Sequence, residues 1–410
     1  MKKIVLLIIT LFLANQAIKA QTVVLDANGV TVKWTGTTVP FPYFVQASPR
    51  GTLEWFAIVD NSTLYQIAGY TYDFQSGITY FTPPGSSAPI PFNNIVTTLI
   101  TDMSSMFNAS AFNQPIGSWD VSNVTDMSNM FTNASAFNQP IDSWDVSNVT
   151  DMRAMFYGAT FNLPIESWNV SNVTDMSAMF YQALAFNQPI GSWNVSSVTN
   201  MNSMFSGGML SSYVNAFNQP IGSWDVSNVT SMAGMFSEAI AFNQNIGSWN
   251  VSNVTEMGGM FSGGQLSTAN YDALLIGWST IGSNETPLKS NVNFDGGNSY
   301  YCNGTTARAS IISTYGWAIT DAGLNCALDT EEFDTNSLKL YPNPVLSILN
   351  IQTPNDMPIT SFRILDLLGK IIIEQKTNSN TINTETLSKG LYILEVFSGK
   401  DKFISKFIKE

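Results

Sequence analysis

The middle of the chain repeats one pattern of apolar and polar positions. Aligned on a Phe-Asn pair, the copies are spaced by 25, 24, 25, 31 and 25 residues. Their common text is AFNQPIGSWDVSNVTDMSNMF, and a half copy at 96–107 precedes them. A fixed period of this length is typical of repeat proteins, in which each unit buries its apolar face against the next unit. The six full copies begin at Ala111, Ala136, Thr160, Ala185, Ala216 and Ala241.

The first half of each copy has the alternation of a β-strand. Trp119 and Val121 are two residues apart, so a strand places both side chains on one face and points Asp120 to the other. We predict that such strands form a parallel sheet along the stack, about 4.8 Å apart. An outward row of tryptophans that stacks on sugars is the alternative, and the pairing with Val121 favours burial. The equivalent tryptophans are Trp144, Trp168, Trp193, Trp224 and Trp249.

The second half of each copy has helical spacing. Val124, Met127, Met130 and Phe131 lie at i, i+3, i+6 and i+7, which predicts one apolar face of a short helix. Thr125 or Asp126 would then be its N-cap. A single copy is too small to bury a Trp, two Met and two Phe. We therefore predict a stack of copies with one shared core, in a fold that is mainly β with short helices.

These motifs carry a resemblance to a known family. WDVSNVTDMSNMF together with FNQPI resembles the BspA-like repeats, a divergent leucine-rich-repeat type of bacterial surface proteins. The resemblance covers residues 95–265 and implies a leucine-rich-repeat-like solenoid of six full 25-residue repeats. It also implies adhesion to host proteins, matrix proteins or other bacteria. The chain departs from ordinary leucine-rich repeats because Trp, Val, Met and Phe stand where Leu or Ile is usual.

The segments next to the repeats are expected to close the stack. Residues 21–94 are rich in aromatic and β-branched residues and predict an N-terminal β-rich cap. Residues 266–326 predict a C-terminal cap, with helical spacing at 266–279 and 307–314 and a strand at 316–319. Cys302 and Cys326, the only two cysteines, are expected to form a disulfide in an exported protein, with two free thiols as the alternative.

The composition changes after an acidic linker at 327–337. Short alternating runs at 349–352, 361–365, 370–374, 391–396 and 403–408 predict a β-sandwich in residues 338–410. The opening YPNP, the DLLGK turn, the LSKGLY stretch and the terminal KFIK resemble the type IX secretion C-terminal sorting domain of Bacteroidota. That resemblance implies interaction with the type IX secretion machinery, cleavage of the domain, and surface anchoring or release. An ordinary immunoglobulin-like binding domain is the alternative.

The first twenty residues predict the compartment. Met1–Lys3 are basic at two of three positions, an apolar run follows to Leu13, and a more polar exit ends at Ala20. This arrangement is typical of a secretory signal peptide, residues 1–20, with cleavage before Gln21. No later stretch has the length and apolarity of a membrane-spanning helix. The sequence thus predicts a protein that is secreted or displayed on the outer surface of the cell.

Charge narrows the function classes. Between residues 95 and 265 the chain has eleven acidic residues and one basic residue, Arg153, so binding of nucleic acid is not expected. Histidine is absent, which removes the commonest general base and metal ligand. No nucleophile, phosphate-loop or zinc motif is recognisable. We predict a binding or structural protein with no cofactor, and not an enzyme.

Two weaker hypotheses remain from the polar positions. Asp120 and Asp145 in one column, and Asp126 and Asp151 in a second, are candidate Ca²⁺ ligands, because Ca²⁺ prefers several oxygen ligands. The favoured interpretation assigns these carboxylates to N-caps, Asx turns and a solvated face. The recurring Asn-Val-Thr fits a glycosylation acceptor, but turn chemistry explains it better. The leading functional prediction is binding of a protein or glycan by a surface-displayed protein, through the extended sheet face of the repeats and the loop at 207–215. The alternatives are a structural cell-surface or biofilm component and, more weakly, a polysaccharide-degrading enzyme.

Overall fold

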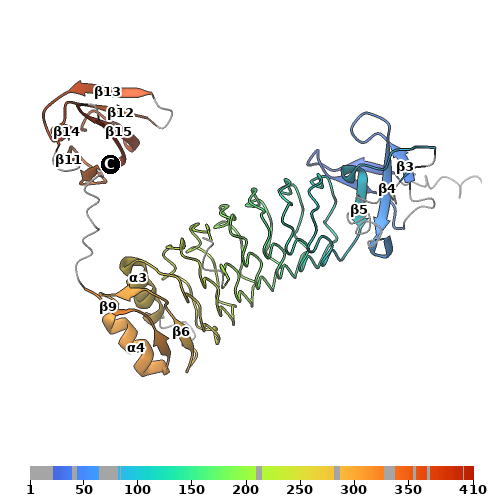
Figure 1. Cartoon of the computed structure of the whole chain (residues 1–410), viewed down its shortest axis with the longest axis horizontal. Coiled ribbons are helices and arrows are strands. Elements are labelled where there is room, and N and C mark those ends of the chain that lie inside the picture. The colour runs from blue at the N-terminus through green and yellow to red at the C-terminus, as the bar shows by residue number, and fades with distance from the viewer. Residues whose placement is uncertain are drawn as a thin grey trace, which may run out of the picture. The chain divides into compact units, whose positions relative to one another are not determined.

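The computed structural model divides into two compact units, residues 1–325 and 326–410. It describes residues 22–38, 44–63, 82–83, 85–208, 215–280, 287–326, 338–353, 357–366, 370–399 and 401–410. The predicted signal peptide, the predicted linker and most of the predicted insertion, at 209–214, lie outside these residues. The described part is mainly β, and its α-helices are α3 (Thr268–Ser279) and α4 (Thr305–Tyr315) (Figure 1).

The N-terminal part of the first unit contains a hairpin and a small sheet. β1 (Val23–Leu25) pairs antiparallel with β2 (Val32–Trp34). β3 (Phe44–Ala47) pairs antiparallel with β4 (Glu54–Asp60), and β4 pairs parallel with β5 (Ile95–Leu99). The 3-10 helices η1 and η3 follow β4 and precede β5, at Asn61–Thr63 and Phe92–Asn94.

β4 joins two cores because successive side chains of a strand point to opposite faces. Phe56 and Ile58 pack in a small cluster with the hairpin, whereas Ala57 and Val59 belong to the large core that continues into the repeats. The hairpin also contacts the first repeat directly, since the Val32 N–H donates to the Ser118 carbonyl at 2.9 Å. This N-terminal part thus buries the side of the first repeat that no other repeat covers.

Residues 100–208 and 215–264 wind as successive coils, which we call the coil stack (Figure 1). Parallel β-bridges join each coil to the next at one position of the repeat. The bridged residues are Asp102, Asp126, Asp151, Asp175, Asn200, Ser231 and Glu256. We call this position and the six that follow it in each coil, as in 126–132, the ladder face.

Hydrogen bonds on the ladder face alternate between two kinds of partner. The N–H groups of Met127, Asn129 and Phe131 donate to carbonyls of the next coil, at 2.8–3.0 Å. At alternate positions, Met130 and Thr132 donate to the carbonyl three residues back in the same coil, at 3.2 and 3.1 Å. The segment is therefore a string of turns and not a helix, so the predicted short helix at 124–131 is wrong. Its apolar residues are nevertheless all buried.

The predicted strand at Trp119 and Val121 is also wrong. These residues lie between turns and make no β-bridge, and the parallel pairing runs through the Asp126 position instead. Asp120 does not point to water: its side chain is 2% exposed, because the N-terminal hairpin covers the first coil. The side chains of Trp119 and Val121 are both buried in the core.

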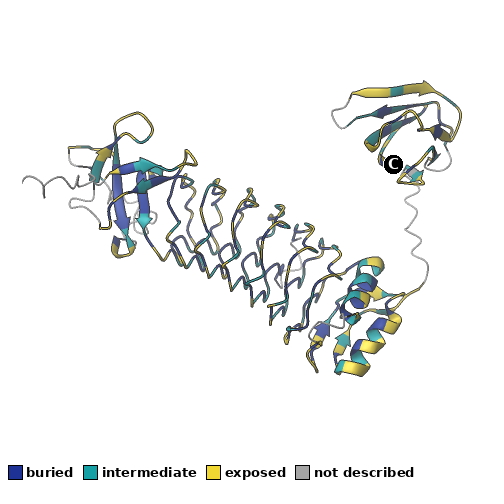
Figure 2. Cartoon of the chain, turned by 180° about the vertical axis from the view of Figure 1, so that it is seen from behind, coloured by how far each residue is buried: buried dark blue, intermediate teal, exposed yellow. Residues whose placement is uncertain are grey.

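The core of the coil stack consists of columns of aromatic rings. Equivalent phenylalanines of adjacent coils stack with centroids 5.6 Å apart for Phe131 and Phe156 and 5.7 Å for Phe156 and Phe180. Trp144 and Trp168 stack at 6.4 Å with an interplanar angle of 3°. Figure 2 shows the buried residues along the inner side of every coil. Each ring is therefore covered by the equivalent ring of the next coil, which is the arrangement that a repeated sequence favours.

Two helices and short parallel strands end the first unit. β6 (Asn293–Asp295) pairs with β8 (Ala318–Thr320), and β7 (Tyr300–Tyr301) pairs with β9 (Gly323–Leu324). α3 and α4 confirm the two predicted helices within one or two residues, and β8 confirms the predicted strand. α4 exposes its outer face, drawn yellow in Figure 2. Cys302 and Cys326 are both disulfide-bonded.

The second unit contains two antiparallel sheets around one core. The first has the order β10-β11-β14 and the second β13-β12-β15-β16. Both sheets contribute to one cluster that includes Leu349, Phe362 and Phe407. The strands are β10 (Lys339–Tyr341), β11 (Ile348–Gln352), β12 (Ser361–Leu365), β13 (Ile371–Lys376), β14 (Thr381–Asn383), β15 (Gly390–Ser398) and β16 (Asp401–Lys409). Five of them confirm the predicted runs, and the sequence analysis missed β10 and β14.

Candidate functional site on the ladder face

The tryptophans of the repeats are structural. Trp119 is fully buried, and Trp168, at the centre of the stack, is 3% exposed. Each indole N–H donates to a backbone carbonyl of the preceding coil or segment, for example from Trp168 to Ile141 at 3.0 Å. A solvent-facing row of tryptophans is therefore excluded. The same bond forms at Trp119, Trp144, Trp193, Trp224 and Trp249, at 2.8–3.1 Å.

The Asp120 column forms turns. In every coil the side-chain oxygen at this position accepts a hydrogen bond from the N–H two residues later, for example from Ser147 to Asp145 at 3.1 Å. Asp120 has in addition the ammonium of Lys33 at 3.9 Å, while its second oxygen has no hydrogen-bond partner among the described residues. Burial lowers the pKa of the Lys33 ammonium, but the hydrogen bond to Asp26 and the negative charges of Asp120 and Asp26 outweigh it. The pKa of Lys33 is therefore raised.

The second acidic column is the bridged position of the ladder face. Asp126, Asp151 and Asp175 are successive bridge partners, and each carboxylate accepts from an N–H two residues on. Burial raises the pKa of Asp151, and the charges of Asp126 and Asp175 add to the increase, against the lowering influence of Arg153. In the next coil Asn200 replaces the acid and donates to Asp175 Oδ2 at 3.1 Å.

The candidate Ca²⁺ ligands do not gather into a metal site. Among the described residues, no group of three or more acidic, histidine or cysteine side chains is placed to hold a metal ion. Asp120, Asp126, Asp145 and Asp151 each use an oxygen to accept a backbone N–H. The geometry therefore fits the Asx-turn interpretation of these residues.

The asparagine of the Asn-Val-Thr motif also has a structural bond. Asn148 Nδ2 donates to the Ser122 carbonyl of the preceding coil at 2.7 Å, and Asn172 Nδ2 donates to the Ser147 carbonyl at the same distance. The threonine hydroxyl makes the same kind of contact, from Thr150 to the Thr125 carbonyl at 3.1 Å. The recurrence of this motif therefore follows from the stacking of the coils.

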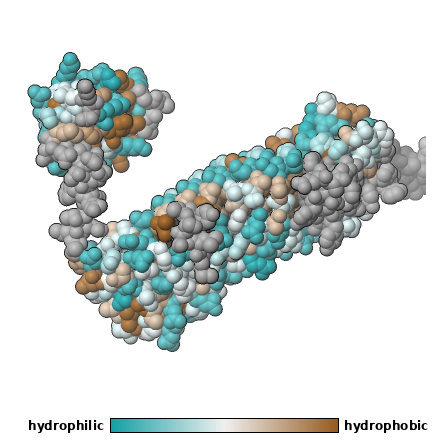
Figure 3. Space-filling view, viewed as in Figure 1, coloured by the Kyte–Doolittle hydropathy of each residue, from teal (hydrophilic) through white to brown (hydrophobic). Residues whose placement is uncertain are grey.

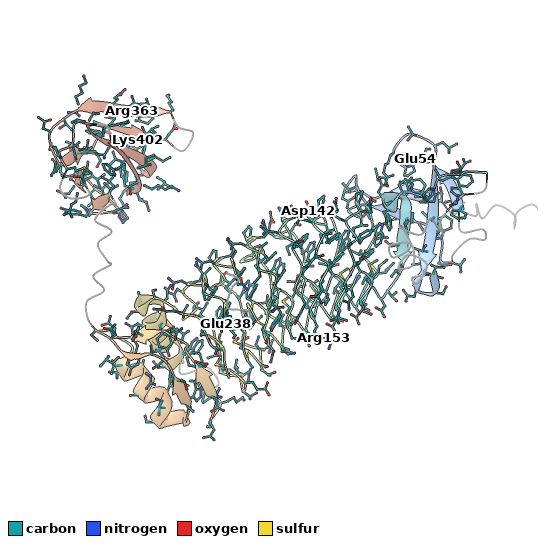
Figure 4. All side chains as sticks on the ribbon, in the orientation of Figure 1. Glu54, Asp142, Arg153, Glu238, Arg363 and Lys402 are labelled. Atoms are coloured by element: carbon teal, nitrogen blue, oxygen red, sulfur yellow. The ribbon has the colours of Figure 1, made fainter. Side chains whose placement is uncertain are left out.

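A shallow groove of about 590 Å³ runs along the ladder face over several coils. Small side chains such as Ala154 and Ala178 form its floor, and Arg153 and Tyr157 stand beside them. The stick view places Arg153 and Asp142 on opposite edges of the coils (Figure 4). The remaining lining residues are polar: Asn129, Thr132, Ser177, Asn200, Asn202, Thr230, Ser231 and Glu256.

Tyr157 and Tyr181 form a pair at this face. Their rings stack with centroids 4.6 Å apart and an interplanar angle of 13°, and both side chains are half-buried. Partial burial and the neighbouring Tyr181 raise the pKa of the Tyr157 phenol. Arg153, the single basic residue of the repeats, is 52% exposed and lies 3.6 Å from Asp151. The groove thus combines one tyrosine of this pair, one cation and many amide and hydroxyl groups.

This groove was not predicted, although the sequence contains a signal for it. The core positions are nearly identical in all copies, but the ladder-face positions differ. The residue after the first methionine is Ser128, Arg153, Ser177, Asn202, Ala233 and Gly258 in the six full coils. Variation between copies of one repeat marks a surface that is not constrained by packing. Comparison of the copies position by position would have found it.

Two family models match parts of the chain. Residues 339–410 match the secretion system C-terminal sorting domain. Residues 85–162 and 207–280 match a second family, described as a Mycoplasma protein of unknown function, DUF285. No curated protein matches the chain.

The match at 339–410 indicates a protein exported to the cell surface or beyond it, as the sorting motifs predict. Among the described residues no helix has the length and apolarity to cross a membrane. The DUF285 match covers parts of the coil stack and is consistent with the predicted repeat family. Its description names no function, so the activity must be argued from the surface.

Proposed function

We propose that the chain is a non-catalytic binding protein, exported by the type IX secretion machinery and displayed outside the cell. The groove on the ladder face is the observation that supports binding, since it gathers the groups that vary between copies. The sorting-domain match at 339–410 supports export. The ligand is a surface protein or glycan that the groove contacts over several coils.

The fold supports an extended binding surface. We infer that the coil stack is a leucine-rich-repeat-like solenoid of six full repeats, and that the two sheets of the second unit form a β-sandwich. The inter-coil bridges and the two-sheet core support these assignments. A solenoid presents many equivalent positions in a row, which suits an elongated ligand. In the view of Figure 3, the described surface of the coil stack is mostly hydrophilic with scattered apolar spots.

The alternative function is a structural component of the cell surface or biofilm that has no discrete ligand. It is favoured by the regularity of the coils, because identical repeats stack well without any binding role. The two functions differ in a simple expectation. A structural component adheres without saturation and tolerates changes at the ladder face. A binding protein adheres saturably, and changes at the ladder face weaken its adhesion.

Surface display of the full chain in a type IX-competent host tests the proposal. We expect saturable adhesion to a protein-coated or glycan-coated surface, and loss of display when residues 339–410 are deleted. The deletion control separates export from binding, because the protein then remains inside the cell envelope. Display without saturable adhesion to any coated surface would favour the structural alternative. Deletion of 209–214 tests whether the predicted insertion takes part.

A further inference from the structure

We propose that the ladder-face groove binds an extended neutral glycan, with its sugar rings in register with the coils and Tyr157 as its aromatic contact. The inference deepens the proposed binding function and rests on it. It depends on four observations about the groove: its available hydrogen-bonding groups, its backbone, its period and its charge.

The groove contains polar groups that are not used by the fold. Among the described residues, the side-chain amide of Asn129, the hydroxyl of Ser177 and the phenol of Tyr157 have no hydrogen-bond partner, although each lies in or beside the groove. Amides and hydroxyls next to an aromatic ring are the groups that bind a pyranose, which has polar edges and an apolar face. An aromatic ring supplies contact area at low entropic cost.

The backbone of the ladder face is unsuited to an extended peptide. A peptide that adds a strand needs free N–H and carbonyl groups on a sheet edge. Here the N–H groups of Met127, Asn129 and Phe131 already donate to the next coil, and those between them close turns. Only side chains remain for a ligand, so a peptide would lose the bonds that usually hold it.

The period of the groove matches a glycan better than a peptide. Equivalent positions recur once per coil, about 4.8 Å apart, as the 4.6 Å between the Tyr157 and Tyr181 rings illustrates. An extended glycan places one sugar ring after another at a distance close to this spacing. An extended peptide advances about 3.3 Å per residue and repeats its same-face side chains at about 6.6 Å, and neither distance is in step with the coils.

Charge selects a neutral ligand. The groove has one cation, Arg153, which already lies 3.6 Å from Asp151. Asp126 and Asp175 occupy the same column on either side, and Glu256 lines the far end. A polyanionic glycan would be repelled along most of the groove. Arg153 remains able to donate to sugar hydroxyls, because its side chain is 52% exposed.

The test uses the full chain and calorimetric titration with linear hexasaccharides of glucose, mannose, xylose and N-acetylglucosamine, with oligogalacturonate as the anionic comparison. We expect at least one neutral hexasaccharide to bind at millimolar concentration and oligogalacturonate not to bind. Tyr157→Ala should weaken binding about tenfold, the factor that corresponds to loss of one aromatic contact. Ser177→Arg should abolish it by filling the groove.

Matched controls keep the outcome interpretable. Ser147→Arg places the same side chain in the neighbouring coil outside the groove, and Tyr300→Ala removes an exposed tyrosine of β7. Both should bind like the unmodified chain, and the thermal unfolding of all four variants should show that they fold. Binding that Tyr157→Ala and Ser177→Arg leave unchanged would overturn the groove as the binding site, while the proposal that the chain is an exported binding protein would stand.

Two further results would contradict the inference. Adhesion to a protein-coated surface that Ser177→Arg blocks, with no hexasaccharide bound, would identify a protein ligand in the same groove. Absence of binding to every hexasaccharide and to every coated surface would overturn both the glycan inference and the proposed function.

Discussion

Single residues in left-handed conformation shape every coil. The fourth ladder-face position has a positive φ in each of them, including 58° at Asn129 and 53° at both Ala154 and Ala178. This conformation lets alternate N–H groups point to the next coil. It costs an L-residue about 1 kcal/mol, and glycine avoids that cost. The two last coils have Gly234 and Gly259 there.

This geometry predicts the effect of glycine at Ala178. Ala178→Gly should raise the free energy of unfolding by about 0.5–1 kcal/mol, because relief of the left-handed strain exceeds the entropy lost by glycine. The control is Ala185→Gly, an exposed position without positive φ, which should lower the free energy of unfolding. Urea unfolding of both variants measures the difference. Equal effects at the two positions would contradict the strain argument.

Asp151, in the acidic column of the ladder face, is expected to oppose folding at neutral pH. The pKa of Asp151 in the folded chain is raised from its ordinary value of 3.8, mainly by burial and then by Asp126 and Asp175. A group whose folded pKa is raised contributes stability below its unfolded pKa, and that contribution is lost as the pH rises through the folded pKa. The ionised Asp151 should therefore cost stability at pH 7 and not at pH 3.

Replacement of Asp151 by asparagine tests this sign. Asp151→Asn should raise the free energy of unfolding at pH 7, since the amide can donate to a neighbouring carboxylate as Asn200 does. The difference from the unmodified chain should shrink as the pH falls toward the ordinary pKa of aspartate. Urea unfolding across this range measures it, with Asp225→Asn outside the column as control. A difference that grows at acidic pH would show that the sign is wrong.

At the scale of the elements, local signals predicted what local interactions form. The helices at 268–279 and 305–315 and five strands of the second unit follow from their own spacing. The turns of the coils could not be predicted from their own spacing, because apolar residues at i, i+3 and i+4 fit a string of turns as well as a helix. The choice is made by the neighbouring coil, which accepts every second N–H of the segment. These bonds join residues of different coils, which are far apart in the sequence, so a local pattern cannot predict them.

Long-range contacts explain the other errors at this scale. Asp120 has the same sequence surroundings as Asp145, yet it is buried, because the hairpin at 23–34 covers the first coil alone. The groove cannot be predicted from the sequence of a single repeat, because its lining residues come from several coils. The buried positions, by contrast, could be predicted, because the apolar residues recur at the same positions of every copy.

One buried carboxylate holds the end of the first unit together. Asp272 in α3 accepts from the N–H groups of Cys302, Asn303 and Gly304 at 2.7–2.9 Å, just before α4 begins. Three charge-assisted bonds to one buried side chain stabilise both helices. They act next to the disulfide-bonded Cys302, so the covalent link and the carboxylate fix the same turn.

Asp272→Asn should lower the free energy of unfolding by about 2 kcal/mol, because an amide nitrogen replaces an acceptor that buried N–H groups need. Hydrogen exchange should accelerate in 300–315 before it changes in the coils. Asp142→Asn, an exposed change at the edge of a coil, is the control and should have little effect. Exchange that accelerates equally across the whole unit would contradict a local role.

At the scale of the molecule, the coil stack depends on contacts between neighbours. Each coil buries its rings against the equivalent rings of the next coil, so no coil has a core of its own. The hairpin and sheet at one end, and the helices at the other, cover the rings that would otherwise lie open. The stack should therefore unfold as one block, and the groove exists only while several coils remain in register.

Hydrogen exchange measured by mass spectrometry on the full chain tests this central claim most directly. Peptides that span the ladder-face positions from 127 to 236 should all be strongly protected, because their alternate amides donate to the next coil. They should lose protection together as urea is added, with one midpoint. Rapid exchange of these amides in the absence of urea, or midpoints that differ widely from one copy to the next, would contradict the account.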